Sequence, residues 1–182
     1  MASALQLAIV AVILTTCTAA SADMERIATP CKTGICFHWW PKVAIPPGWQ
    51  HDRDHSLHYN FNALAPEGKS FADAETVMYV NAVYRPRVPE AKTLDEFIRN
   101  DHTNFVNEAP DLKIVPAGTL KTANDRIVHS WTLSPASKGQ WERVAYLEQG
   151  EYYIVFVISS RNQAGLRAAG PSFEQLVAAY RE

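Results

Sequence analysis

The chain has 182 residues, a formal net charge of −2 and 47% hydrophobic residues, with 17 basic and 19 acidic side chains. This balance excludes an intrinsically disordered chain, which combines low hydrophobicity with high net charge, and it argues against a nucleic-acid-binding protein, which carries an excess of Lys and Arg. The length is typical of one domain.

The N-terminus has the pattern of an export signal. Residues 1–22 contain no charged side chain, residues 7–14 are an unbroken apolar run, and Ala20-Ser21-Ala22 supplies the small residues that a signal peptidase recognises. The run is too short to cross a bilayer. We therefore predict a signal peptide over 1–22 and a periplasmic or secreted protein with no membrane span after cleavage. The alternatives are an uncleaved anchor and lipidation at Cys17.

After cleavage, two cysteines remain in a polar N-terminal arm over residues 23–38. An even number of cysteines in an exported chain predicts a disulfide, here between Cys31 and Cys36. The C-x4-C spacing differs from the C-x-x-C of redox enzymes, so a structural bond is favoured over a redox-active pair.

The next segments favour strands and turns. The aromatic residues 37–40 have strand character, and Pro46-Pro47-Gly48-Trp49 predicts a turn. Apolar and polar residues alternate over 57–63, which predicts a half-buried strand. Residues 76–84 are apolar on both faces apart from Asn81, which predicts a central strand covered on both sides.

The second half predicts two helices among further strands. Thr93-Leu94-Asp95-Glu96 matches a capping box that begins a helix of three to four turns, and Ser172 is the expected N-cap of a final helix. Strands are predicted at 112–116 and 127–133, followed by a hairpin of 141–148 and 152–159. The expected fold class is therefore α+β, an α-β-α sandwich whose mostly antiparallel sheet is covered by two main helices.

These motifs together resemble the PsbP-like superfamily, which includes small bacterial exported proteins. The resemblance rests on Pro46-Pro47-Gly48-Trp49, on the capped helix beginning at Thr93, on the late hairpin, and on Phe173-Glu174-Gln175-Leu176-Val177 near the end. It implies a single PsbP-like domain over 39–182, with an α-β-α sandwich. It also implies mostly non-enzymatic roles as accessory, binding or assembly proteins, and it transfers no catalytic residue.

Two groups of residues are candidate sites. His51, Asp54, His55 and His58 are residue types that ligate zinc, although His51 and His55 would converge only on a helix, where the pattern predicts a turn and a strand. A binding surface is the second candidate, because Trp is enriched at binding hot spots and Arg meets acidic partners; its residues are Trp39, Trp40, Arg85 and Arg87.

No catalytic motif such as Gly-x-Ser-x-Gly or His-Glu-x-x-His occurs. The leading hypothesis is an exported, non-enzymatic binding, assembly or accessory protein that needs no cofactor and is a monomer or weak oligomer. Its expected partner is another exported protein or a small ligand, and not nucleic acid. One alternative is a small metal-dependent hydrolase that uses the cluster between His51 and His58. Another is an inhibitor or immunity-type partner protein.

Overall fold

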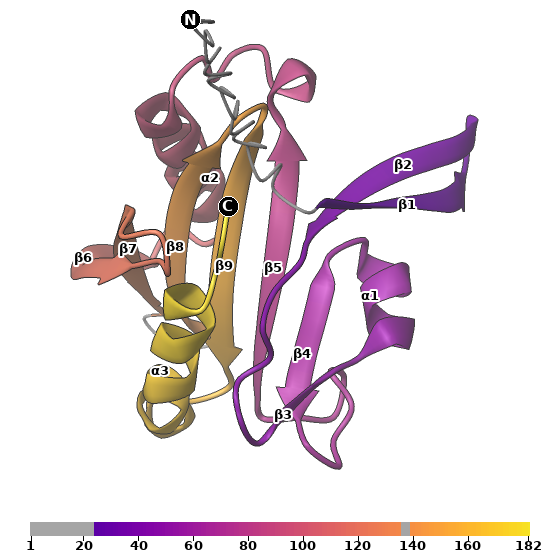
Figure 1. The fold of residues 1–182 in the computed structure, drawn as a ribbon. Coiled ribbons are helices and arrows are strands. Elements are labelled where there is room, and N and C mark those ends of the chain that lie inside the picture. Colours follow the sequence, from indigo (N-terminus) through magenta and orange to yellow (C-terminus); the bar gives the residue numbers. More distant parts are fainter. Residues whose placement is uncertain (1–23, 136–138) are drawn as a thin grey trace, which may run out of the picture.

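The computed structural model describes residues 24–135 and 139–182. The predicted signal peptide and Cys17 lie outside these residues. The described chain forms a nine-stranded antiparallel sheet with the strand order β1-β2-β5-β9-β8-β7-β6, to which β3 and β4 are joined through β5 (Figure 1). Within the described residues, no helix is long and apolar enough to span a bilayer.

The elements follow one another with short connections. The strands are β1 (Met24–Cys31), β2 (Gly34–Pro41), β3 (Trp49–His51), β4 (Asn62–Pro66), β5 (Thr76–Tyr84), β6 (Lys113–Lys121), β7 (Ile127–Ser134), β8 (Trp141–Gln149) and β9 (Tyr152–Ser160). The helices are α1 (Arg53–Tyr59), α2 (Leu94–Glu108) and α3 (Gln163–Ala178), with a 3-10 turn η1 (Arg85–Arg87).

The centre of the sheet is the pairing of β5 with β9, which runs in unbroken register from Thr76 opposite Ser160 to Tyr84 opposite Tyr152. Alternate side chains enter two separate cores. Phe156 packs with α3 on one face, and Val157 packs with α2 on the other (Figure 1). The predicted α+β sandwich with two main covering helices is thereby confirmed, as is the central strand predicted at 76–84.

The two covering helices differ in how well the sequence located them. The capping box of α2 is present, with Thr93 accepting from the Glu96 amide and Glu96 accepting from the Thr93 amide. By contrast, α3 begins after Asn162, well before the N-cap predicted at Ser172. Two glycines and Pro171 in its first part are poor helix formers, which concealed the helix. At Gly165 an added Cβ would lie 2.4 Å from the Ser160 hydroxyl, so only glycine allows this helix to approach β9.

The strand predicted over 57–63 is wrong in its first part, because residues 53–59 form α1. The Asp52 side chain accepts from the His55 amide and caps this helix, and Asn60 ends it in the left-handed conformation, at φ 64°. Leu57 and Tyr59 are 41% and 46% exposed. Their alternation with polar residues therefore does not reflect one buried face.

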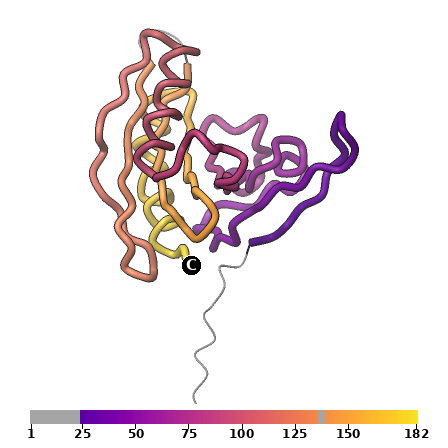
Figure 2. Tube along the Cα trace, turned by 90° about the horizontal axis from the view of Figure 1, so that it is seen from above, coloured from indigo at the N-terminus to yellow at the C-terminus, as the bar shows by residue number. Residues whose placement is uncertain are grey.

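The N-terminal arm is a β-hairpin. The strands β1 and β2 pair from Met24 opposite Pro41 to Cys31 opposite Gly34, and the Cys31–Cys36 disulfide lies near the turn. The hairpin meets β5 through one registered pair, Trp39 opposite Ala82, and it reaches beyond the sheet on the side away from β6 (Figures 1 and 2). Its tip therefore depends on its own strand pairing and on the disulfide.

Replacing both cysteines, Cys31→Ser with Cys36→Ser, should destabilise the hairpin alone. Loss of a crosslink that closes so short a ring costs about 2 kcal/mol, which corresponds to about 30-fold faster amide exchange in β1 and β2. Hydrogen exchange measures this, with the amides of β9 as the internal control. Equal acceleration in β9 would contradict the independence of the hairpin.

Candidate functional site

The residues predicted as metal ligands are not brought together. His51 lies in β3 with its Nε2 2.9 Å from the hydroxyl of the buried Ser56, whereas His55 pairs through Nδ1 with Asp52 at 2.8 Å. His58 packs edge-on against Tyr59. Among the described residues, no three His, Cys, Asp or Glu side chains are placed to hold a metal ion.

The histidine at position 51 has a structural role. The Ser56 hydroxyl donates to the Asp52 carbonyl and accepts from the Ala63 amide, so the hydrogen bond from His51 completes a junction between α1 and β4. Burial, followed by the positive charge of Arg53, lowers the pKa of His51. A neutral imidazole suits this buried hydrogen bond.

The four residues predicted for binding divide into two pairs. Trp40 is fully buried, so it is a core residue and does not line a surface groove as expected. The Arg85 guanidinium is engaged by Glu148 and by the carbonyl of Lys92, which fixes the connector after β5. Trp40 is therefore not available to a partner, whereas the Arg85 side chain is 31% exposed but held by contacts within the chain.

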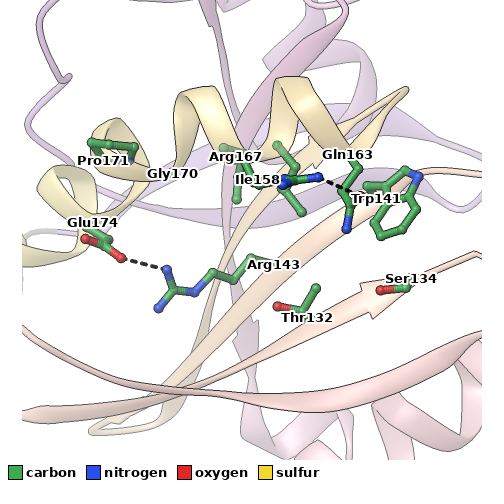
Figure 3. A pocket seen from close by; sticks show the side chains of 11 residues that line it. Thr132, Ser134, Trp141, Arg143, Ile158, Gln163, Arg167, Gly170, Pro171 and Glu174 are labelled. Atoms are coloured by element: carbon green, nitrogen blue, oxygen red, sulfur yellow. Dashed lines mark hydrogen bonds and ion pairs between the residues drawn. The ribbon is translucent and has the colours of Figure 1, made fainter.

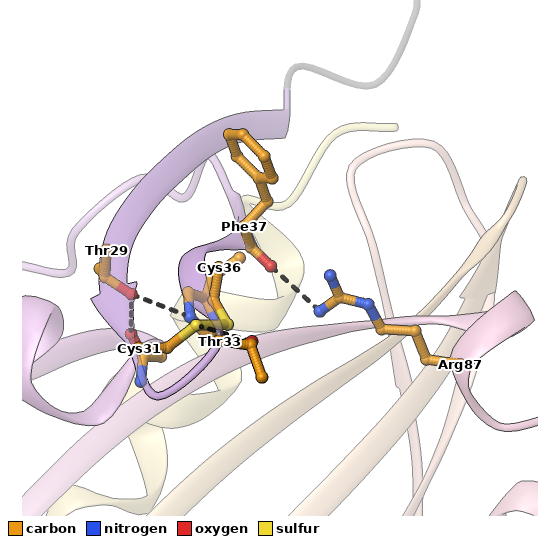
Figure 4. The surroundings of a disulfide bond; sticks show 8 residues. Thr29, Cys31, Thr33, Cys36, Phe37 and Arg87 are labelled. Atoms are coloured by element: carbon orange, nitrogen blue, oxygen red, sulfur yellow. Dashed lines mark hydrogen bonds between the residues drawn. A yellow bond between two sulfur atoms is a disulfide. The ribbon is translucent and has the colours of Figure 1, made fainter.

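Trp39 and Arg87 remain at the surface. The Arg87 guanidinium donates to the carbonyl of Phe37 at 3.0 Å (Figure 4). It also lies 4.5 Å from the centre of the Trp39 ring. The same Trp39 ring also packs against Tyr84, with ring centroids 5.0 Å apart, beside the core on the α3 face. Arg87 thus joins the hairpin to the connector at the edge of a hollow.

That hollow is one half of an aromatic groove on the α2 face of the sheet. A pocket of about 250 Å³ adjoins one of about 410 Å³, and Tyr59 lines both. The smaller pocket is lined by residues that include His38, Trp39, Asn60, Asn81 and Arg87, and the larger by residues that include Phe61, Phe71, Val77, Tyr79 and Arg161. We refer to both together as the aromatic groove.

Stacked rings form its wall. The Tyr59 and Phe61 rings are 5.5 Å apart and nearly parallel, and Phe61 stacks on Tyr79 at 4.5 Å. Phe71 lies 5.7 Å from both Tyr59 and Phe61. The left-handed turn at Asn60 brings Tyr59 at the end of α1 beside Phe61, only two residues later. This continuous aromatic surface is what a flat or extended apolar ligand requires.

Polar groups stand at both ends of the groove. Arg161 donates to the Ala72 carbonyl at one end, and Arg87 lies at the other. Burial, followed by the charge of Arg87, lowers the pKa of His38 beside it. The amide side chain of Asn81 lines the smaller pocket and that of Gln140 the larger one, and both can donate to or accept from a ligand backbone.

A partly buried acidic network lies below the groove, between α2 and the sheet. The Tyr146 hydroxyl donates to Asp101 at 2.6 Å, and Glu142 accepts from the hydroxyl of Ser159, which lines the groove. Burial raises the pKa of Asp101 and of Glu142, and the charge of Asp101 raises that of Glu142 further. Burial and these two carboxylates also raise the pKa of Tyr79.

Sequence reasoning did not single out this network, because its members come from separate elements. The one local signal is Glu142, which shares a strand face with the apolar Val144 and Tyr146. A charged residue in such a register indicates either an edge position or a buried group with a partner.

Glu142→Gln should reduce the loss of stability with rising pH. Asp101 and Glu142 bind their protons more tightly in the folded protein than in the unfolded chain. The free energy of unfolding therefore decreases as the pH rises from about 4 through the folded-state pKa values of these two carboxyls. Urea unfolding between pH 4 and 8 measures this decrease, with the exposed Glu90→Gln as the matched control. Identical pH profiles of wild type and Glu142→Gln would contradict a raised pKa.

No family model matches the chain, and no curated protein matches it in sequence. Solved structures do match. Protein PA94 of unknown function from Pseudomonas aeruginosa has 10% identity and a TM-score of 0.50 over 87% of this chain and 99% of its own. The Ran-binding protein Mog1p of Saccharomyces cerevisiae matches at 8% identity and a TM-score of 0.42, over 83% and 85% of the two chains.

A cyanobacterial PsbP from Synechocystis also matches, at 12% identity and a TM-score of 0.44, over 92% of this chain and 98% of its own. At such identities the likeness to PA94 shows a shared fold and carries no activity, and the two weaker matches add no argument. The fold predicted from the motifs therefore has counterparts among solved structures, while membership in the PsbP-like superfamily stays a prediction.

Proposed function

We propose that the protein is an exported, non-enzymatic binding or accessory protein whose aromatic groove holds an extended segment of a partner protein. The observation that carries this proposal is the wall of stacked rings, in which Tyr59 is 46% exposed although its neighbours are aromatic. Exposed Tyr and Phe in a concave surface bury a large area on binding at a small cost in side-chain entropy.

The shape and chemistry of the groove favour an extended, proline-bearing segment. Proline-rich segments adopt the polyproline II helix before binding, and their rings pack against flat aromatic faces. Two adjoining pockets provide room for successive residues, and Asn81 and Gln140 offer hydrogen bonds to exposed peptide carbonyls. Arg87 adds positive charge at one end, which suits an acidic residue flanking the prolines, whereas at the other end Glu75 lines the same pocket as Arg161 and offsets its charge.

The groove bears on the three hypotheses drawn from the sequence: a binding surface, a metal-dependent hydrolase and an inhibitor or immunity-type protein. The binding surface predicted around Trp39 and Arg87 is retained as one end of it, without Trp40 and Arg85. The metal-dependent hydrolase lacks a ligand set among the described residues. An inhibitor or immunity-type protein would use the groove in the same way, with the bound segment belonging to the protein that it neutralises.

Tyr59→Ala should weaken binding of a ten-residue polyproline peptide by at least about tenfold, because it removes the ring shared by both pockets. Titration of the labelled protein by NMR measures the affinity and locates the shifted amides. Leu57→Ala is the matched control, since Leu57 is an exposed residue of the same helix and does not line the groove.

Two outcomes would contradict the proposal. One is the absence of shifts around Tyr59, Phe61 and Phe71 at millimolar peptide. The other is equal affinity of wild type and Tyr59→Ala. A linear oligosaccharide serves as a competing probe, and shifts produced by the sugar alone would reassign the groove to carbohydrate binding.

Export has its own test. Expressed in a bacterial host, the protein should be recovered outside the cytoplasm with Asp23 as its first residue and with Cys31 and Cys36 joined. Because a signal peptidase requires a small residue before the cleaved bond, Ala22→Tyr should leave the precursor uncleaved, whereas Ala19→Ser should not. N-terminal sequencing and mass measurement with and without reductant decide this. Recovery of an unprocessed wild-type chain with free thiols would refute export by this route.

A further inference from the structure

A second concave site lies on the opposite face of the sheet from the aromatic groove. A pocket of about 370 Å³ opens between α3 and the strands β7, β8 and β9 (Figure 3). Trp141 and the half-buried Leu166 provide an apolar wall, and hydroxyls of Thr132 and Ser134 lie along β7. The volume is that of a site for a small molecule.

Two arginines line the pocket, and only the Arg167 guanidinium is available to bind an anionic ligand. Arg143 is engaged on all sides, since it donates to the Ser130 hydroxyl, to the Ala117 carbonyl and to Glu174. Arg167 donates to the Gln163 side chain, 2.8 Å away, and no carboxylate in the described part of the chain forms an ion pair with it (Figure 3). Because Glu174 is neutralised by Arg143, the pocket carries a net positive charge at Arg167.

The helix is built to leave this space open. Gly170 lines the pocket, and a Cβ added there would meet nothing within 4 Å. Pro171 follows it inside α3 and has no amide hydrogen, so the Arg167 carbonyl cannot accept the usual helical hydrogen bond from residue 171. Two residues that weaken helices thus stand where the helix borders the pocket.

We propose that this pocket binds a small organic carboxylate with a flat apolar body. The Arg167 guanidinium binds the carboxylate of the ligand. A charge-assisted hydrogen bond to this arginine, which forms no ion pair among the described residues, is the strongest polar contact that the pocket can make. The apolar body lies against Trp141 and Leu166, in the open space beside Gly170. The site is independent of the aromatic groove and takes a different class of ligand.

Titration with 1-naphthylacetate tests this proposal, with the uncharged 1-naphthylacetamide as the matched ligand. We expect the carboxylate to shift the Trp141 indole N–H signal, assigned through Trp141→Phe, and to bind at least about tenfold more tightly than the amide. Arg167→Gln should weaken carboxylate binding by about tenfold and leave amide binding unchanged. Arg99→Gln, an exposed arginine of α2, is the control for overall charge.

Gly170→Leu provides a variant that fills the pocket without touching its arginines. Leucine is a better helix former than glycine, and the open space at this position accepts a side chain, so the fold should be retained. Binding of the carboxylate should be lost. The proposal is overturned if acid and amide bind equally, if Arg167→Gln binds like wild type, or if the folded Gly170→Leu variant still binds. Polyproline binding in the groove on the other face should be unaffected by any of these variants.

Discussion

The pairing of β5 with β9 is the constraint on which the rest of the structure depends. Both strands carry apolar side chains on both faces of the sheet. Each face must therefore be covered by other elements to bury these side chains. The helix α3 covers one face and α2 the other. Neither helix covers its face completely, and the uncovered parts of the two faces are where the two concave sites lie.

On the α2 face, the segment between β3 and β5 borders the area that α2 leaves uncovered. The helix α1 ends at Tyr59, Asn60 in the left-handed conformation reverses the chain, and Phe61 follows directly before β4. The result is a stack of rings over Tyr79 of the central strand. Beneath it, Asp101 and Glu142 are held in a low-dielectric layer, where their protonated forms are favoured.

On the α3 face, the helix itself makes the opening. Gly165 must be glycine because the helix approaches β9 too closely for a side chain, whereas Gly170 has free space in front of it. The same residue type therefore serves close packing at one position and leaves a pocket open at the other. The Arg143–Glu174 pair fixes the floor of this pocket, so Arg167 is the side chain that can respond to a ligand.

The sequence by itself determined the central strand β5, the hairpin of β8 and β9, the capped start of α2 and the cysteine pair, because apolar runs, capping chemistry and cysteine number are local signals. It misplaced α1 and the start of α3, where Asn60, Gly165 and Pro171 act through backbone geometry and close approach. Only the tertiary structure decided that Trp40 is core while Trp39 is at the surface, although the two are adjacent. It alone brought Tyr59, Phe71 and Tyr79 together, since ring contacts between separate elements depend on how the chain folds back and leave no mark in local spacing.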